Sequence, residues 1–193
     1  MLPSHCRRDE TLESPRLAGL AGAAVGHRVE RPISQPQINE RRHRMSNDAK
    51  VIKDLMTTLK DGVEGFSSGA EKLTETKQPA LASTFRKYAD QRAAYYAELE
   101  KLAAEYGDDI EPSGSVVASI HRGWMAVKDA ISGSSAEGVL DAAEQGEDHA
   151  KSSYEDALKE DVSAGLATVI RRQYEGVCAG HDEVRSLRDS HAA

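Results

Sequence analysis

The spacing of apolar residues constrains the fold of this chain more than any other feature. Apolar side chains recur every three or four residues along four long stretches, at about residues 48–76, 79–106, 136–159 and 163–188. This is the period of an α-helix that buries one face and exposes the other. The sequence therefore predicts an all-α protein built as a bundle of four long helices.

The second and third of these stretches are joined by a long connection rather than a tight turn. Turn-forming residues fill positions 108–115, and a shorter amphipathic stretch then runs to about Ile131. A four-helix bundle with one long crossover has the ferritin-like arrangement, whereas an up-and-down bundle uses short loops throughout. We expect a ferritin-like bundle whose crossover between the second and third long helices contains an extra short helix.

Charge divides the chain at Met45. Residues 1–44 hold eight Arg and five acidic residues, a net charge of +3, whereas residues 45–193 hold 17 basic and 27 acidic residues, a net charge of −10. Four of the six prolines lie in the first segment, which shows no helical period. We therefore expect residues 1–44 to be a disordered extension, with Met45 as an alternative translation start, and residues 45–193 to form the folded domain.

The composition also limits the compartment and the partners. The two cysteines, Cys6 and Cys178, offer no disulfide framework, and no apolar run approaches the roughly 20 residues of a bilayer span. Arg7-Arg8 resembles a twin-arginine leader only weakly, because acidic residues precede the short apolar run. The acidic domain disfavours nucleic acids and anionic membranes, which bind basic surfaces. We expect a cytoplasmic protein that binds neither nucleic acid nor membrane.

Polar residues interrupt the faces that the helical period assigns to the interior. At about 100° per residue, Glu144, Glu147 and Lys151 share an arc with the apolar residues of the third long helix. The inner faces of the second and fourth long helices also hold Arg92, Tyr174 and His181. Any chemistry inside the bundle depends on this polar set.

One interpretation of the polar set is a metal site. Glu144, Glu147 and His181 would be the ligands, with Tyr174 and Glu98 supporting them from outside. Ferritin-like carboxylate bundles hold two metals with Glu from two helices and Glu-x-x-His from the other two. No Glu-x-x-His occurs in the four long stretches. A di-iron site would therefore have too few ligands, and one weakly held ion is the most that this set offers.

The interpretation that we favour is a polar core without a metal. Arg92 and Lys151 would neutralise the two inward glutamates, and Tyr174 and His181 would complete a buried hydrogen-bonded network that fixes the helix register. The two cations would also repel a divalent metal ion.

Four groups of residues give the chain a family resemblance. They are Asp61-Gly62-Val63-Glu64-Gly65-Phe66, Gly114-Ser115 followed by His121-Arg122-Gly123-Trp124, Glu144-Gln145-Gly146-Glu147-Asp148, and Arg172-Gln173-Tyr174 with His181-Asp182. In these motifs the chain resembles an uncharacterised bacterial ferritin-like family, known only as a domain of unknown function, over nearly all of residues 46–193. The resemblance implies a four-helix bundle and no established activity.

The sequence contains no nucleophile elbow, phosphate loop, dinucleotide fingerprint or Cys-x-x-Cys pair. We therefore expect a non-enzymatic helical-bundle protein that self-associates as a homo-oligomer without a cofactor. Analogy with ferritin-like relatives adds a stress-related role. The alternative is a metal-binding ferritin-like protein that binds or oxidises iron or another divalent metal.

Overall fold

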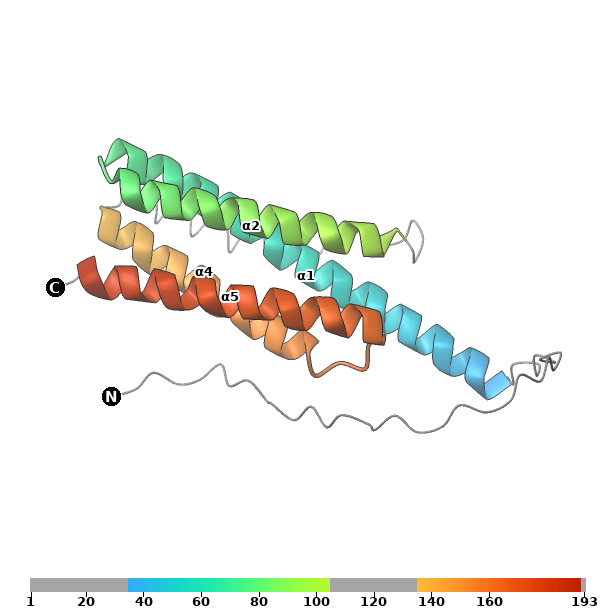
Figure 1. The fold of residues 1–193 in the computed structure, drawn as a ribbon. Helices are drawn as coiled ribbons and strands as arrows, with labels where there is room; N and C mark the ends of the chain where they lie inside the picture. Colours follow the sequence, from blue (N-terminus) through green and yellow to red (C-terminus); the bar gives the residue numbers. More distant parts are fainter. Residues whose placement is uncertain (1–34, 105–134, 192–193) are drawn as a thin grey trace, which may run out of the picture.

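A computed structural model describes residues 35–104 and 135–191 of the chain. These residues form four α-helices and no strand: α1 (Gln35–Glu75), α2 (Pro79–Ala103), α4 (Ala136–Ala157) and α5 (Ala164–His191) (Figure 1). The predicted all-α helical bundle is confirmed. The predicted crossover with its short helix, and the His-Arg-Gly-Trp motif within it, lie outside the described residues. None of the described helices is long and apolar enough to cross a membrane.

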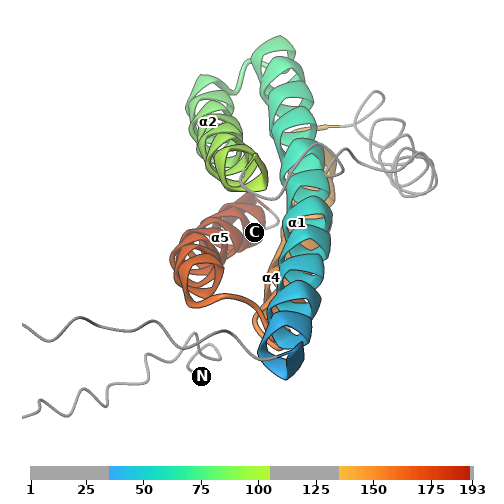
Figure 2. The ribbon, with the colours of Figure 1, turned by 90° about the vertical axis from the view of Figure 1, so that its right-hand side faces the viewer.

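The helices form two hairpins that pack against each other. Residues 76–78 join α1 to α2, and residues 158–163 join α4 to α5. α1 packs closely against both α2 and α4, whereas α2 and α5 lie further apart and are bridged in part by long polar side chains. Viewed along the bundle, the four helices surround one interior (Figure 2).

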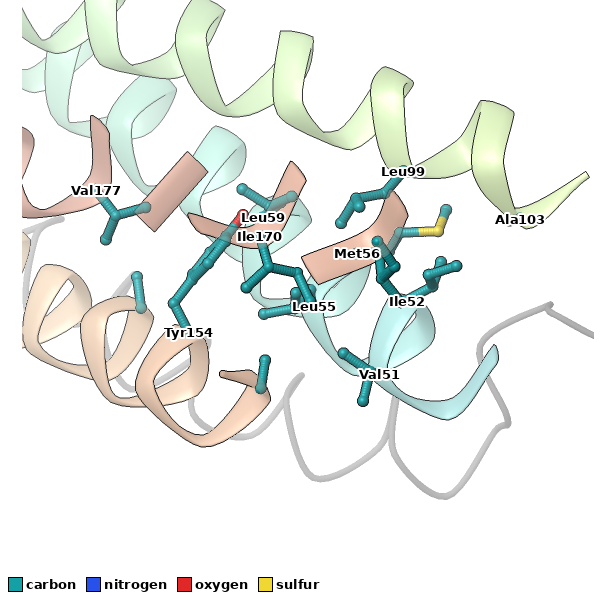
Figure 3. Close-up of a cluster of buried hydrophobic side chains, with 13 residues drawn as sticks. Val51, Ile52, Leu55, Met56, Leu59, Leu99, Ala103, Tyr154, Ile170 and Val177 are labelled. Atoms are coloured by element: carbon teal, nitrogen blue, oxygen red, sulfur yellow. The ribbon is translucent and has the colours of Figure 1, made fainter. Parts of the chain in front are cut away.

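The apolar stripes bury two clusters of side chains at successive levels of the bundle. The first cluster includes Ile52, Leu55, Leu59, Leu99, Tyr154, Ile170 and Val177 (Figure 3). The second cluster includes Phe66, Leu73, Leu81, Phe85, Leu140 and Val184. A level between them, near residue 62 of α1 and residue 92 of α2, is left for polar side chains.

The first helix begins earlier than the sequence predicts. The helix begins at Gln35, not near Asp48, so residues 35–44 are helical rather than disordered. Pro36 lies in the first turn, where a missing N–H costs no hydrogen bond, and no further proline follows until Pro79. Once the buried part of α1 is nucleated, each added residue gains a backbone hydrogen bond, so the helix extends without an apolar stripe. The other helices begin within one residue of the expected positions and end within three.

Polar contacts from Asn47 and Asp48 fix the turn between α4 and α5 against α1. The buried carboxylate of Asp48 accepts a hydrogen bond from the backbone N–H of Ser163 at 2.8 Å. The Ser163 hydroxyl in turn accepts from the N–H of Leu166 in the first turn of α5, at 3.4 Å. The Asn47 side chain donates to the carbonyl of Asp161 at 2.9 Å. Asn47 and Asp48 of α1 therefore fix the position of the α4–α5 hairpin along α1.

Candidate functional site: a polar layer inside the bundle

The level between the two apolar clusters contains a buried ion pair. Nη2 of Arg92 on α2 lies 2.6 Å from Oε2 of Glu147 on α4. Arg92 is 1% exposed and Glu147 is 2% exposed, so both charges are withdrawn from water. A second guanidinium nitrogen of Arg92 donates to Gln91, while its Nε is buried without a hydrogen-bond partner among the described residues. The pair links two helices that come from different hairpins.

Glycines on the two remaining helices make room for this pair. A Cβ atom on Gly62 of α1 would lie 3.3 Å from Cγ of Arg92. A Cβ atom on Gly180 of α5 would lie 2.8 Å from Oε2 of Glu147 and 3.1 Å from Nη2 of Arg92. All four helices therefore contribute to the level: two supply the charges, and two supply the space.

The surroundings of the ion pair have opposing effects on the pKa of Glu147. Burial raises the pKa of Glu147 because it disfavours the charged form, while the charge and the hydrogen bond of Arg92 act to lower this pKa. The rings of Phe66 and Tyr88 lie beside the guanidinium of Arg92, with centroids 5.9 and 6.0 Å from Cζ. These aromatic rings favour the cation that Glu147 requires.

His181 forms a second polar contact of this layer, which joins α4 to α5. Its side chain is buried, and Nε2 lies 2.9 Å from Oδ1 of Asp148 on α4. Its Nδ1 lies 3.1 Å from Oδ1 of the neighbouring Asp182. Both aspartates are exposed, so the imidazole lies between two solvated carboxylates. The ring therefore links the two helices at the edge of the polar layer.

A chain of hydrogen bonds crosses the first apolar cluster and reaches the surface. The Tyr154 hydroxyl donates to Oε1 of Gln173 at 2.7 Å, and Nε2 of Gln173 donates to Oε2 of Glu98 at 2.8 Å. The other oxygen of Glu98 pairs with the exposed Arg172. Gln173 is 0% exposed, although it was not among the polar residues predicted to lie inside. At 100° per residue, the side chain of Gln173 points only about 20° away from that of the buried Leu166 around the axis of α5. This helical phase alone would have predicted that Gln173 is buried.

Other candidate residues have different partners from those expected. Glu144 pairs with Arg188 near the end of α5, not with Arg92 or Lys151. Lys151 is half-buried and makes no ion pair within the described ranges. Lys151 is about two helical turns, roughly 10 Å, from Glu144, which is too far for an ion pair. The other inward glutamate, Glu147, is already paired with Arg92. Tyr174 is also half-buried and donates to Glu155 at 2.8 Å rather than to the core.

The predicted metal ligands do not gather around a common point. Residues 35–104 and 135–191 contain no group of three or more His, Cys, Asp or Glu side chains that could hold a metal ion. Glu144, Glu147 and His181 each contact a different charged partner: Arg188, Arg92 and the two aspartates. The arrangement can hold charges in fixed positions between helices, but it presents no open set of ligands in these ranges.

Comparison with known proteins adds a family without a known activity. A family described as domain of unknown function (DUF2383) matches residues 47–160, which is more than half of the chain. No curated protein matches the sequence. The matched range includes α2, α4 and most of α1, and it therefore contains both members of the buried ion pair.

Proposed function

We propose that this chain, which belongs to the DUF2383 family, is a non-enzymatic, self-associating helical-bundle protein of the ferritin-like type. Support for a non-enzymatic role comes from the interior, where the inward carboxylates neutralise cations of the protein itself. A stress-related role accompanies the ferritin-like type by analogy. Within the described residues, no geometric observation favours the metal-binding alternative.

Support for self-association comes from one exposed apolar residue near the amino-terminal end of α1. Met45 is 52% exposed, and it is the one exposed large hydrophobic residue among the side chains that the structure describes. It precedes the fully buried Ile52 by seven residues, so the two share nearly the same face of α1. The face that other helices cover from Ile52 onward is therefore uncovered at Met45.

Light scattering and sedimentation of the full chain test this proposal. We expect a mass that is a multiple of the single-chain mass. We expect Met45→Ser to weaken association about tenfold, because burying a methionine side chain contributes about 1.5 kcal/mol or more. Ala93→Ser on the exposed face of α2 is the matched control and should leave the mass unchanged. A single-chain mass at every concentration would refute self-association.

A further inference from the structure

The amino-terminal end of α1 extends past the rest of the bundle. We call residues 35–44 of α1 the basic arm. Every arm residue whose side chain is described is exposed. The described contacts of α1 with the α4–α5 turn begin at the base of the arm, where Nε of Arg44 lies 3.7 Å from Oδ1 of Asp161. Figure 1 shows this end of α1 projecting beyond that turn.

The arm carries the opposite charge from the domain that follows it. Its sequence holds Arg41, Arg42 and Arg44 against the single acid Glu40. Residues 45–193 have a net charge of −10. A nucleic acid or another polyanion that approached the arm would therefore also meet the repulsion of an acidic domain. An acidic protein surface of limited size is a better match for the arm.

Such a surface lies in a groove between α1 and the end of α4. The groove has a volume of about 210 Å³, and its apolar lining includes Leu55 and Ala157. Its polar lining includes three acids, Asp54, Asp156 and Glu160, and one base, Lys50. Asp54 and Asp156 are exposed, and their ion pairs with Lys50 and Lys159 are solvated contacts of the kind that contribute little.

The arm cannot enter the groove of its own chain. Arg42 on the arm and Asp54 in the groove belong to the same continuous helix, twelve residues apart, which is about 18 Å along the axis. Arg44 at the base of the arm reaches only Asp161 beside the groove. Because a helix cannot fold back on itself, the rest of the arm can reach this groove only in another molecule.

We infer that the basic arm of one copy docks in the α1–α4 groove of a second copy. This inference rests on the proposed self-association and assigns it a surface. Arg42 and Arg44 of the arm meet the carboxylates of the groove, and the same docking covers Met45, which directly follows the arm. Because these charges are exposed, added salt weakens the assembly.

Charge reversal of the two surfaces tests the inference. The arm variant is Arg42→Glu with Arg44→Glu, and the groove variant is Asp54→Lys with Asp156→Lys. Each variant alone brings like charges together, and we expect its dissociation constant in sedimentation to rise about tenfold or more. In an equal mixture, the acidic arm of one variant faces the basic groove of the other, and the reverse contact is also complementary. The mixture should therefore associate again.

The controls separate docking from folding and from other partners. All four positions are exposed, so the thermal unfolding of each variant should match that of the wild type. Arg171→Glu with Arg185→Glu on α5 reverses two exposed charges far from the arm and should not change association.

Three outcomes would overturn the inference. If the wild type assembles and both variants also assemble, the oligomer uses another surface, and only the inference fails. If the arm variant stays assembled but loses retention on a heparin column, the arm binds polyanions. If the wild type is a single chain at every concentration, the proposed self-association fails together with the inference.

Discussion

Arg92→Met should lower the free energy of unfolding by about 3–5 kcal/mol, because it leaves the carboxylate of Glu147 buried without its counter-charge. Urea unfolding followed by circular dichroism measures this loss. A loss below about 0.5 kcal/mol, the size usual for surface positions, would mean that Arg92 is not in the interior.

The double variant Arg92→Met with Glu147→Leu is the control for this prediction. It removes both charges and keeps the volume, so its stability should be close to that of the wild type or higher. The loss in Arg92→Met alone should also shrink at low pH. Since burial raises the pKa of Glu147, its protonated form favours the folded state at low pH, and that contribution is lost as the pH rises through the folded-state pKa.

Gly180→Ala should destabilise the protein by about 1–3 kcal/mol although alanine favours helices. The new Cβ atom would lie 2.8 Å from Oε2 of Glu147 and 3.1 Å from Cε1 of Tyr88. Oε2 of Glu147 is the atom that pairs with Arg92, so moving it away from the new Cβ atom would disturb the ion pair.

Gly146→Ala is the matched control, because a Cβ atom there meets no atom within 4 Å. Because the position is exposed and helical, the higher helix propensity of alanine should raise the free energy of unfolding by about 0.5–1 kcal/mol. If Gly180→Ala stabilised the protein as Gly146→Ala does, the close packing of α5 against the ion pair would be wrong.

The parts of the fold that follow from helical periodicity could be predicted from the sequence. Ile52, Leu59, Phe66 and Leu73 repeat every seven residues, and all four are buried as expected. Periodicity also placed Arg92 and Glu147 inside, because each takes an apolar position in an otherwise regular stripe. Their pairing could be anticipated from charge alone, since a buried carboxylate requires a buried cation.

Residues whose positions depend on packing between distant helices could not be predicted in this way. Arg188 pairs with Glu144 because the end of α5 lies beside the start of α4, and helical phase says nothing about this register. Among the first ten residues of α1, every side chain that the structure describes is exposed, so no buried apolar stripe reveals that they are helical. Gln173 shares the buried arc of α5, but its polarity concealed its position.

The central claim is that the inward carboxylates pair with cations of the bundle and do not form a metal site. Titration of the metal-free protein with ferrous iron, zinc or manganese, followed by calorimetry and by oxygen consumption, tests it most directly. We predict no stoichiometric binding at micromolar concentrations and no oxygen-dependent oxidation of iron. Tightly bound iron that is lost in Glu147→Ala would contradict the claim and support the metal-binding alternative.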